Sequence, residues 1–326
     1  MKVVECFCGA GLSSIGIVRA GGDLVGACDY DHSAVTMFNS QPGLLPPVAT
    51  CCDLDTYEIP PCDLLSGGPV CKAFSPGAAI FGTKGKDDDR NTFPLFFRAI
   101  DRSKPKHILI ENSFGMERFG DEDTSDPNEW PLTGMASNGY IDEIVGGLKN
   151  RGYKVDWTEV DCYDFGVPQH RRRLIFLGSK TANWKMPAVF AWDREGPCTV
   201  GECMGPVPEN DPWPLTKPCT EAEMTYLLRD PDRLKRHPSQ EMHKAGHTVV
   251  SVYRKGAPYG TVRMKDKSLH MCGPRLAARL QGLPDSFKFN MVSRSKAFEA
   301  IGNGFPPQVI EAAVKSLLEV LNGQQV

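Results

Sequence analysis

The sequence predicts an α/β protein with a Rossmann-like domain and a second, smaller domain. Short apolar, β-branched runs alternate with helix-like patterns over the first 180 residues of the 326-residue chain, as in sheets joined by helical crossovers. After residue 180 this alternation fades, and prolines recur at positions 187, 197, 206, 208, 212, 214 and 218. We therefore expect a domain boundary near residue 180.

The composition, 41% hydrophobic and 24% charged, is typical of a soluble globular protein. No apolar run approaches the roughly 20 residues that span a bilayer, and residues 1–19 lack the apolar core of a signal peptide. Twelve cysteines without an export signal indicate reduced thiols in a cytosolic protein. Because their spacings match no zinc pattern, we expect no metal.

The net charge of −3 conceals a basic segment. Residues 226–296 hold 15 lysines and arginines against 5 acidic residues, a balance of +10. Such a segment is typical of a surface that binds a polyanion. It is equally compatible with the solvated face of a mixed surface, so both interpretations stay open at this point.

The first 20 residues predict a strand, a glycine turn and a helix, which is how a Rossmann-like unit opens. Residues 2–7 are apolar and β-branched, Gly9 and Gly11 break the strand, and Ser13 or Ser14 could cap a helix over 15–20. Glycines let a ligand approach the backbone closely. The chain lacks the Gly-Lys-Ser/Thr of a P-loop, which disfavours a nucleoside triphosphate.

Acidic residues follow the next two strands. Asp29 ends a strand over 24–28, where folds of this type bind a ribose diol. Alternatively, Asp29 caps the helix expected over 32–38, a role for which Asp31 is equally well placed. Asp53 follows a third short strand. A glycine turn and two acids at successive strand ends suit a ligand with an adenosine part and no phosphate.

Cys71 lies on a loop at the carboxyl end of a strand expected over 62–65, the end at which open α/β sheets bind ligands. Gly67, Gly68 and Pro69 force a sharp exit from that strand. The thiol of Cys71 is a candidate nucleophile. Taken alone, the stretch favours a structural cysteine, because free cysteines are usually buried and inert.

Two further groups of polar residues are candidates for the same site. Glu111 and Asn112 end a strand over 107–110, so Glu111 is either a catalytic acid or an exposed terminal glutamate. Three arginines at 171–173 precede a strand over 174–178. They could clamp phosphates or a base, or line a basic strand edge. The patterns also predict helices and a strand elsewhere: helices over 92–102, 141–150 and 306–321, and a strand over 153–160.

Together, seven motifs resemble those of the C5-cytosine DNA methyltransferase family. They are Phe7-x-Gly9-x-Gly11, Asp29 with Asp53, Gly68-Pro69-Val70-Cys71-x-x-Phe74-Ser75, Glu111-Asn112, Gln169-x-Arg171-x-Arg173, Pro274-Arg275 with Arg279-Leu280-Gln281-Gly282, and Gly302-Asn303-Gly304-Phe305-Pro306-Pro307. The resemblance covers nearly the whole chain apart from about 180–268. Each motif alone is weak, but seven in the family's order, at sensible spacing, are highly specific.

The resemblance implies a DNA (cytosine-5-)-methyltransferase that transfers a methyl group from S-adenosyl-L-methionine to C5 of a flipped cytosine in double-stranded DNA. Cys71 would add to C6, Glu111 would hydrogen-bond or protonate N3, Arg171 would help hold the base, and Asn112 the loop. The other implied contacts are with the cofactor (Phe7, Gly9, Gly11, Asp29, Asp53, Pro69, Asn303) and with the substrate (Gln169, Arg173, Arg275, Arg254, Lys255, Arg263, Lys265).

The family's two-lobed architecture implies a catalytic and cofactor-binding domain over 1–180 plus 301–326, and a target-recognition domain over 181–300. Arg254, Lys255, Arg263 and Lys265 flank a turn-rich stretch of the basic segment, and we expect them to face DNA. We expect a monomer in the cytoplasm, associated with the nucleoid in a bacterial or phage setting.

The chain departs from the family's usual motifs at several positions. Val70, Lys72 and Ser113 stand where Pro, Gln and Val are usual, and Leu12 and Leu276 where Gly and Glu are usual. These departures bear on rate and substrate, and they leave the catalytic residues in place.

Three rival functions stay open. The first is an RNA (tRNA) cytosine-5 methyltransferase of the same family, which would share all the motifs. The second is a weakly active or inactive DNA-binding relative. The third is a flavin or nicotinamide oxidoreductase, which would share only the glycine turn.

Overall fold

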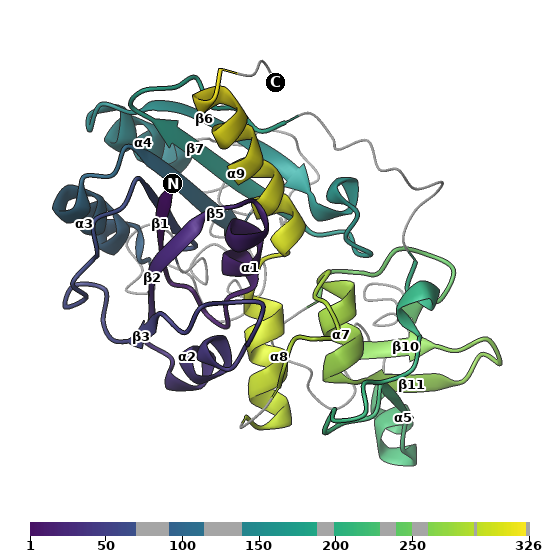
Figure 1. Ribbon diagram of the computed structural model, residues 1–326. Helices are drawn as coiled ribbons and strands as arrows, with labels where there is room; N and C mark the ends of the chain where they lie inside the picture. Colours follow the sequence, from purple (N-terminus) through teal and green to yellow (C-terminus); the bar gives the residue numbers. More distant parts are fainter. Residues whose placement is uncertain are drawn as a thin grey trace.

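The computed structural model describes residues 1–69, 91–113, 139–187, 199–228, 239–249, 260–289 and 292–323. In these residues the chain forms a seven-stranded sheet and a four-stranded sheet. Figure 1 shows α7 (Pro274–Leu280) and α8 (Arg294–Asn303) between the two sheets. The α/β fold class that the sequence predicts is confirmed.

The larger sheet has the strand order β3-β2-β1-β4-β5-β7-β6. The pairs from β3 to β5 are parallel, and β7 runs antiparallel to β5 and β6. Because the order reverses between β1 and β4, their carboxyl ends form the switch point at which such sheets bind ligands. The strands are β1 (Lys2–Cys6), β2 (Asp23–Asp29), β3 (Ala49–Cys51), β4 (Leu64–Gly67), β5 (His107–Ser113), β6 (Lys154–Asp161) and β7 (Arg172–Ser179).

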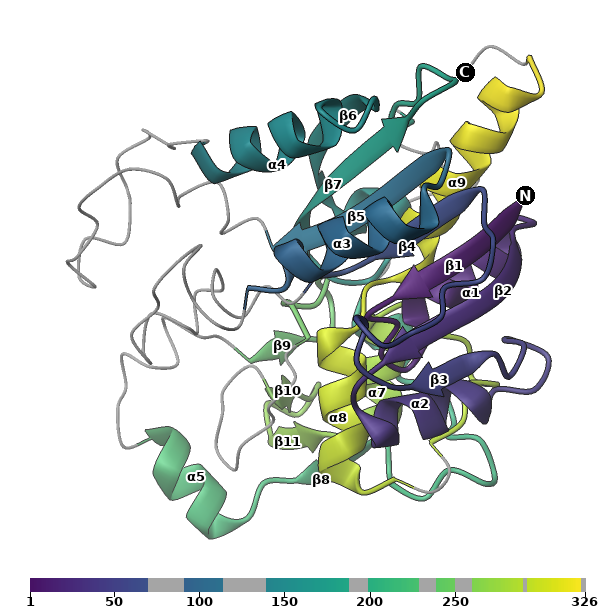
Figure 2. The same ribbon diagram turned by 90° about the vertical axis from the view of Figure 1, so that its left-hand side faces the viewer.

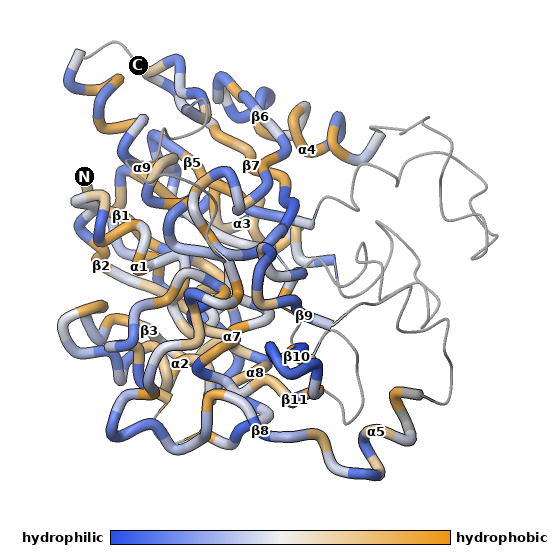
Figure 3. Tube along the Cα trace, turned by 90° about the vertical axis from the view of Figure 1, so that its right-hand side faces the viewer, coloured by the Kyte–Doolittle hydropathy of each residue, from blue (hydrophilic) through white to orange (hydrophobic). Residues whose placement is uncertain are grey.

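Helices cover both faces of this sheet. Val3 and Val4, neighbours in β1, belong to two separate hydrophobic clusters, because successive side chains of a strand point to opposite faces. One cluster includes α1 (Leu12–Arg19), α2 (His32–Asn39) and α9 (Pro307–Leu321); the other includes α3 (Phe93–Ser103) and α4 (Gly139–Lys149). Figure 3 shows hydrophobic stretches along β5, β7 and α7 in the interior.

The C-terminal helix α9 packs against α1 in the first part of the chain (Figure 1). The approach is close: a Cβ added to Gly16 would lie 2.3 Å from the carbonyl oxygen of Pro307. Val309, Ile310 and Leu317 are buried along this side of α9. The end of the chain therefore returns to the sheet that begins it.

The smaller sheet has the order β8-β11-β10-β9, and Figure 2 shows it beside α7 and α8, below the larger sheet. Its strands are β8 (Thr216–Pro218), β9 (Gln240–Glu241), β10 (Thr261–Arg263) and β11 (Leu269–Cys272), accompanied by α5 (Glu221–Leu228). Two short 3₁₀ helices complete the described elements: η5 (Cys162–Phe165) and η6 (Gly201–Cys203). Within the described ranges, no helix is long and apolar enough to cross a membrane.

Some element ends differ from the sequence prediction. β5 runs on to Ser113 instead of ending at residue 110, and α1 begins at Leu12 instead of residue 15. The prediction of a serine cap was wrong, because Gly11 occupies the N-cap position without any side-chain hydrogen bond. Ser14 instead donates a hydrogen bond to the buried carboxyl group of Glu5.

Candidate active site

The glycine turn between β1 and α1 is closely packed at Gly11 and has free space beside Gly9. Phe7, Gly9 and Gly11 have φ angles of 56°, 52° and 84°, in the left-handed region that favours glycine. A Cβ on Gly11 would lie 2.4 Å from Leu45 and 2.7 Å from Phe38. A Cβ on Gly9 would meet no described atom within 4 Å. The turn therefore leaves space for a ligand beside the backbone at Gly9.

Asp29, at the end of β2, is held by two backbone N–H groups. Its Oδ2 accepts from Gly9 and its Oδ1 from Asp31, each at 2.9 Å. Burial raises the pKa of Asp29, and these hydrogen bonds act in the opposite direction. Each oxygen retains acceptor capacity, so the carboxylate can still accept from the two hydroxyls of a ribose. The cap of α2 is Asp31, which accepts from Ser33 and Ala34.

Asp53 lies near Asp29, at the carboxyl ends of the neighbouring strands β3 and β2. The N–H of Cys52, its neighbour, donates to the carbonyl oxygen of Asp29 at 3.1 Å. The Asp53 side chain is exposed, and it accepts from the N–H of Asp55 at 2.9 Å. The two acids and Gly9 therefore all lie at the carboxyl ends of the parallel strands.

Asn112 holds the start of the loop that carries the candidate nucleophile. Its Nδ2 donates to the carbonyl oxygen of Pro69 at 2.9 Å, within a buried setting. Gly68 packs beside Glu111, since a Cβ there would lie 3.3 Å from Glu111 Oε2. Cys71 itself lies outside the described residues. The chain therefore enters the Cys71 loop directly beside Glu111.

Glu111 and Arg173 form an ion pair at the carboxyl end of β5. Arg173 Nε lies 3.0 Å from Glu111 Oε1, and the side chains are 15% and 18% exposed, Arg173 first. The register of β5 and β7 produces this pair. It places Arg173 opposite Ser113, which is two residues from Glu111 and therefore on the same face of the sheet. Burial raises the pKa of Glu111, although Arg173 and Arg171 both oppose the rise. A raised pKa suits a carboxyl group that donates a proton or a hydrogen bond.

Arg171, expected to help hold the base, instead ties separate segments together. Its side chain is buried, and its terminal nitrogens donate to the carbonyl oxygens of Val249, Gly302 and Gly304, each at 3.0 Å. Its positive charge still lowers the pKa of Glu111. The contacts argue against direct binding of a base by Arg171 and favour Arg173 for that role.

Gln169, expected to bind substrate, is fully buried in the same network. Its Nε2 donates to the carbonyl oxygen of Leu280 at 2.7 Å and to Gln281 Oε1 at 2.6 Å. Its Oε1 accepts from the N–H of Val249 at 2.9 Å. Because both ends of the amide are engaged in the interior, Gln169 positions this turn and does not face a substrate.

Asn303 is exposed at the end of α8, between two residues of this network. Gln281 Nε2 donates to the carbonyl oxygens of Ile301 and Gly304 at 2.6 and 3.1 Å. A Cβ on Gly304 would lie 2.5 Å from Leu12, so this turn packs on the start of α1. Asn303 therefore lies on a turn that connects the Arg171 network to the helix after the glycine turn.

Arg275, the third expected substrate contact, is also buried. It forms a bidentate ion pair with Asp211, at 2.5 and 3.0 Å, in which both side chains are less than 5% exposed. It also donates to the carbonyl oxygens of Pro284 and Phe287 and lies 4.6 Å from the Phe289 ring centroid. Through these contacts Arg275 holds distant segments against α7, and its expected contact with substrate stays a prediction.

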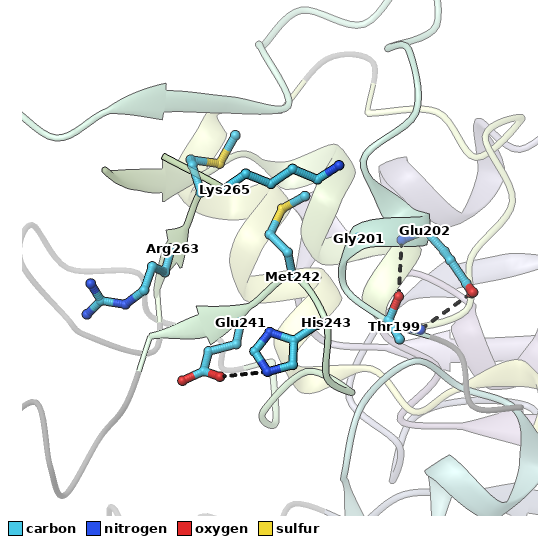
Figure 4. Close-up of a pocket in the computed structure, with 9 residues that line it drawn as sticks. Thr199, Gly201, Glu202, Glu241, Met242, His243, Arg263 and Lys265 are labelled. Atoms are coloured by element: carbon cyan, nitrogen blue, oxygen red, sulfur yellow. Dashed lines mark hydrogen bonds and ion pairs between the residues drawn. The ribbon is translucent and has the colours of Figure 1, made fainter. Parts of the chain in front are cut away.

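A pocket of about 520 Å³ lies between η6 and the smaller sheet (Figure 4). Arg263 and Lys265, both exposed, extend from it in opposite directions. Their expected contact with DNA stays a prediction, and Arg254 and Lys255 lie outside the described residues. The pocket is lined by Thr199, Gly201, Glu202, Glu241, Met242, His243, Arg263, Met264 and Lys265.

The gathered groups are compatible with S-adenosyl-L-methionine. Gly9 leaves room at the backbone, Asp29 can accept from a ribose diol, and Asp53 lies beside it. The Glu111–Arg173 pair, on β5 and β7, lies on the other side of the switch point, next to the entry of the Cys71 loop. Over the described part of the chain, no cluster of three or more metal-ligating side chains is found.

Sequence reasoning missed two polar pairs near this site. The buried Glu5–Ser14 pair could have been suspected, because Glu5 interrupts an apolar strand. The ion pair between Lys296 and Asp31 joins residues far apart in the chain, and no local pattern signals it.

Comparisons with known proteins agree with this arrangement. The model of the C-5 cytosine-specific DNA methylase family matches residues 1–319. Type II methyltransferase M.XorII of Xanthomonas oryzae pv. oryzae is 27% identical, covering 98% of this chain and 84% of that protein. Type II methyltransferase M.AplI of Arthrospira platensis is 28% identical, covering 99% and 87%.

Solved structures support the fold. The S. pombe Dnmt2 methyltransferase superposes with a TM-score of 0.70 at 18% identity, covering 99% of both chains. The Entamoeba histolytica methyltransferase EhMeth gives 0.66 at 17% identity, covering 99% of this chain and 98% of that one. With the family match over nearly its whole length, the chain belongs to the C-5 cytosine-specific DNA methylase family.

Proposed function

We propose that this enzyme methylates C5 of a cytosine in double-stranded DNA, with S-adenosyl-L-methionine as the donor and a covalent bond between Cys71 and C6 as the intermediate. The observation that carries the proposal is the Glu111–Arg173 pair beside the loop that Asn112 holds at Pro69. A largely buried acid with a raised pKa next to a fixed cation matches what activation of a pyrimidine ring requires.

C5 of cytosine is a poor nucleophile, so the ring must first be activated. Addition of the Cys71 thiolate to C6 makes C5 enamine-like. Glu111 donates to N3 and offsets the charge that develops there, and Arg173 donates to the neighbouring O2. When bound, S-adenosyl-L-methionine supplies an electrophilic methyl group. Loss of the proton from C5 and elimination of Cys71 then complete the reaction.

The base must leave the double helix to reach this site. Only 18% of the Glu111 side chain is exposed, and it lies at the edge of a sheet that a stacked base cannot enter. Enzymes that act on a base inside duplex DNA meet this constraint by flipping the nucleotide out of the stack. The proposed substrate is therefore an extruded cytosine.

We further propose a catalytic and cofactor-binding domain over 1–180 plus 301–326 and a target-recognition domain over 181–300. The packing of α9 on α1 supports the return of the chain end to the first domain. The separate four-stranded sheet, built from residues 216–272, supports the second. Arg263 at the end of β10 and Lys265 in the turn after it are the described candidates for DNA contacts.

Transfer of tritiated methyl groups to duplex DNA or to transfer RNA tests the proposal. We expect label in DNA and none in transfer RNA, and a loss of about 10²- to 10⁴-fold in kcat for Glu111→Gln. Glu159→Gln is the matched control, because Glu159 of β6 likewise forms an ion pair with an arginine of β7, Arg172, but is not Glu111. Label in transfer RNA alone would contradict the DNA substrate. Bisulfite sequencing of DNA from expressing cells would then give the target site.

A further inference from the structure

Lys296 of α8 forms an ion pair with Asp31 at the start of α2. Lys296 Nζ donates to Asp31 Oδ2 at 2.9 Å across 265 residues of sequence. The side chains are 40% and 26% exposed, Lys296 first. A second partner, Glu299, lies on the same helix at 2.9 Å. The pair therefore connects the helix between the two sheets to the loop after β2.

Asp31 serves two elements with its two carboxylate oxygens. Oδ1 accepts from the N–H groups of Ser33 and Ala34 at 2.8 and 3.2 Å and caps α2. Oδ2 accepts from Lys296. The pKa of Asp31 is lowered by Lys296 and by these N–H groups, although desolvation opposes the change. Asp31 is thus a charged anchor that is fixed from both sides.

The backbone of Asp31 in turn holds Asp29. Its N–H donates to Asp29 Oδ1 at 2.9 Å, while the N–H of Gly9 donates to Asp29 Oδ2 at the same distance. These two donors belong to different loops and set the plane of the Asp29 carboxylate. A shift of Asp31 would rotate that plane away from the space beside Gly9.

The far end of α8 contacts the catalytic turn. The carbonyl oxygens of Gly302 and Gly304, at and just after the end of the helix, accept from Arg171. The positive charge of Arg171 in turn lowers the pKa of Glu111. One helix thus touches the Asp29 loop at one end and the Glu111 network at the other.

We propose that Lys296 is a positioning residue of the cofactor site: through Asp31 it holds Asp29 in the orientation that binds the ribose. This inference rests on the proposed function, in which Asp29 accepts from the ribose diol. Lys296 contacts no cofactor atom itself. Its loss should therefore weaken cofactor binding and leave the chemistry of the bound complex unchanged.

Calorimetric titration with S-adenosylhomocysteine, which cannot donate a methyl group, tests the inference without catalysis. Lys296→Met should weaken binding about two- to fivefold, the range expected for a partly exposed ion pair. Lys296→Arg should restore it. Glu299→Gln is the matched control, because it removes the other partner of Lys296 and leaves the pair with Asp31 in place.

Two further measurements separate positioning from a general loss of structure. The difference between wild type and Lys296→Met should shrink as salt rises, because salt screens the exposed part of the pair. In steady-state assays the KM for the cofactor should rise while kcat stays unchanged. If Lys296→Met is insoluble, Lys296→Gln takes its place.

Unchanged affinity in Lys296→Met, or an equal loss in Glu299→Gln, would overturn the inference. A wild-type protein that binds neither S-adenosylmethionine nor S-adenosylhomocysteine would instead overturn the proposed function, and the inference with it. Binding by wild type with no effect at Lys296 would reject the inference and leave the proposed function standing.

Discussion

Replacing Gly16 by alanine tests how the end of the chain stabilises the cofactor site. Gly16 lies in α1, directly after the glycine turn, and faces the first turn of α9. The substitution adds one methyl group and removes no polar contact. Its effect therefore reports on the closeness of the two helices.

The magnitude follows from the contacts that the methyl group would make. It would lie 2.3 Å from the carbonyl oxygen of Pro307 and 3.0 Å from the backbone nitrogen of Glu311. Backbone atoms cannot rotate away, so α9 would have to move by about 1 Å to reach ordinary contact distance. Overpacking of this kind costs roughly 1–3 kcal/mol, and alanine recovers about 1 kcal/mol through its helix propensity. Because both contacts are with backbone atoms, the upper part of that range applies, about 2–3 kcal/mol, and we expect a net loss of about 1–2 kcal/mol.

Equilibrium unfolding in urea measures this loss, and Gly146→Ala is the control. Gly146 lies in α4, where an added Cβ would meet no described atom within 4 Å. The same substitution should there stabilise the protein by about 0.5–1 kcal/mol. A Gly16→Ala protein as stable as wild type would refute the close packing of α1 on α9. We also expect Gly16→Ala, but not Gly146→Ala, to bind S-adenosylhomocysteine more weakly than the wild type.

Four further variants have expected outcomes. Arg173→Ala should lower kcat and move the alkaline limb of the pH–rate profile to higher pH, because Arg173 lowers the pKa of Glu111. Arg171→Ala should mainly lower the unfolding midpoint, since three carbonyl oxygens each lose one donor. Burial raises the pKa of Glu5 to about 8, so its contribution to stability is full below its unfolded value near 4.5 and is lost as pH rises through 8. Glu5→Gln should therefore gain stability relative to wild type between pH 6 and 8 in urea titrations, and an equal pH dependence of the two proteins would contradict the assignment. Lys265→Ala should reduce the slope of log affinity for DNA against log salt by about one unit, whereas an unchanged slope would remove Lys265 from the DNA surface.

Local patterns were sufficient for the larger sheet. The alternation of apolar runs, glycine turns and helical faces predicted its strands and helices, with ends shifted by a few residues. The start of α1 was missed for a physical reason: Gly11 adopts a left-handed conformation at the N-cap, and Ser14 is engaged by Glu5. The sequence shows the serines but not the buried acid that competes for them.

Within the site, contacts between residues far apart in the sequence determine which side chains face Glu111 and which are buried. Three arginines in a row carry no information on which one faces Glu111; the antiparallel register of β7 on β5 selects Arg173. Gln169 and Arg275 stand in motifs of the family, yet Gln169 donates to Leu280, 111 residues away, and Arg275 pairs with Asp211, 64 residues away. Such tertiary pairings cannot be read from spacing alone.

The most direct test of the central claim is mass spectrometry of the protein after incubation with S-adenosylmethionine and duplex DNA that contains 5-fluorocytosine. Fluorine at C5 cannot leave as a proton, so the complex between enzyme and methylated base should persist and map to Cys71. Cys51→Ala, which removes an exposed cysteine elsewhere, should form the same adduct, and Cys71→Ala should form none. No adduct in the wild type, or an adduct that survives in Cys71→Ala, would contradict the proposed mechanism.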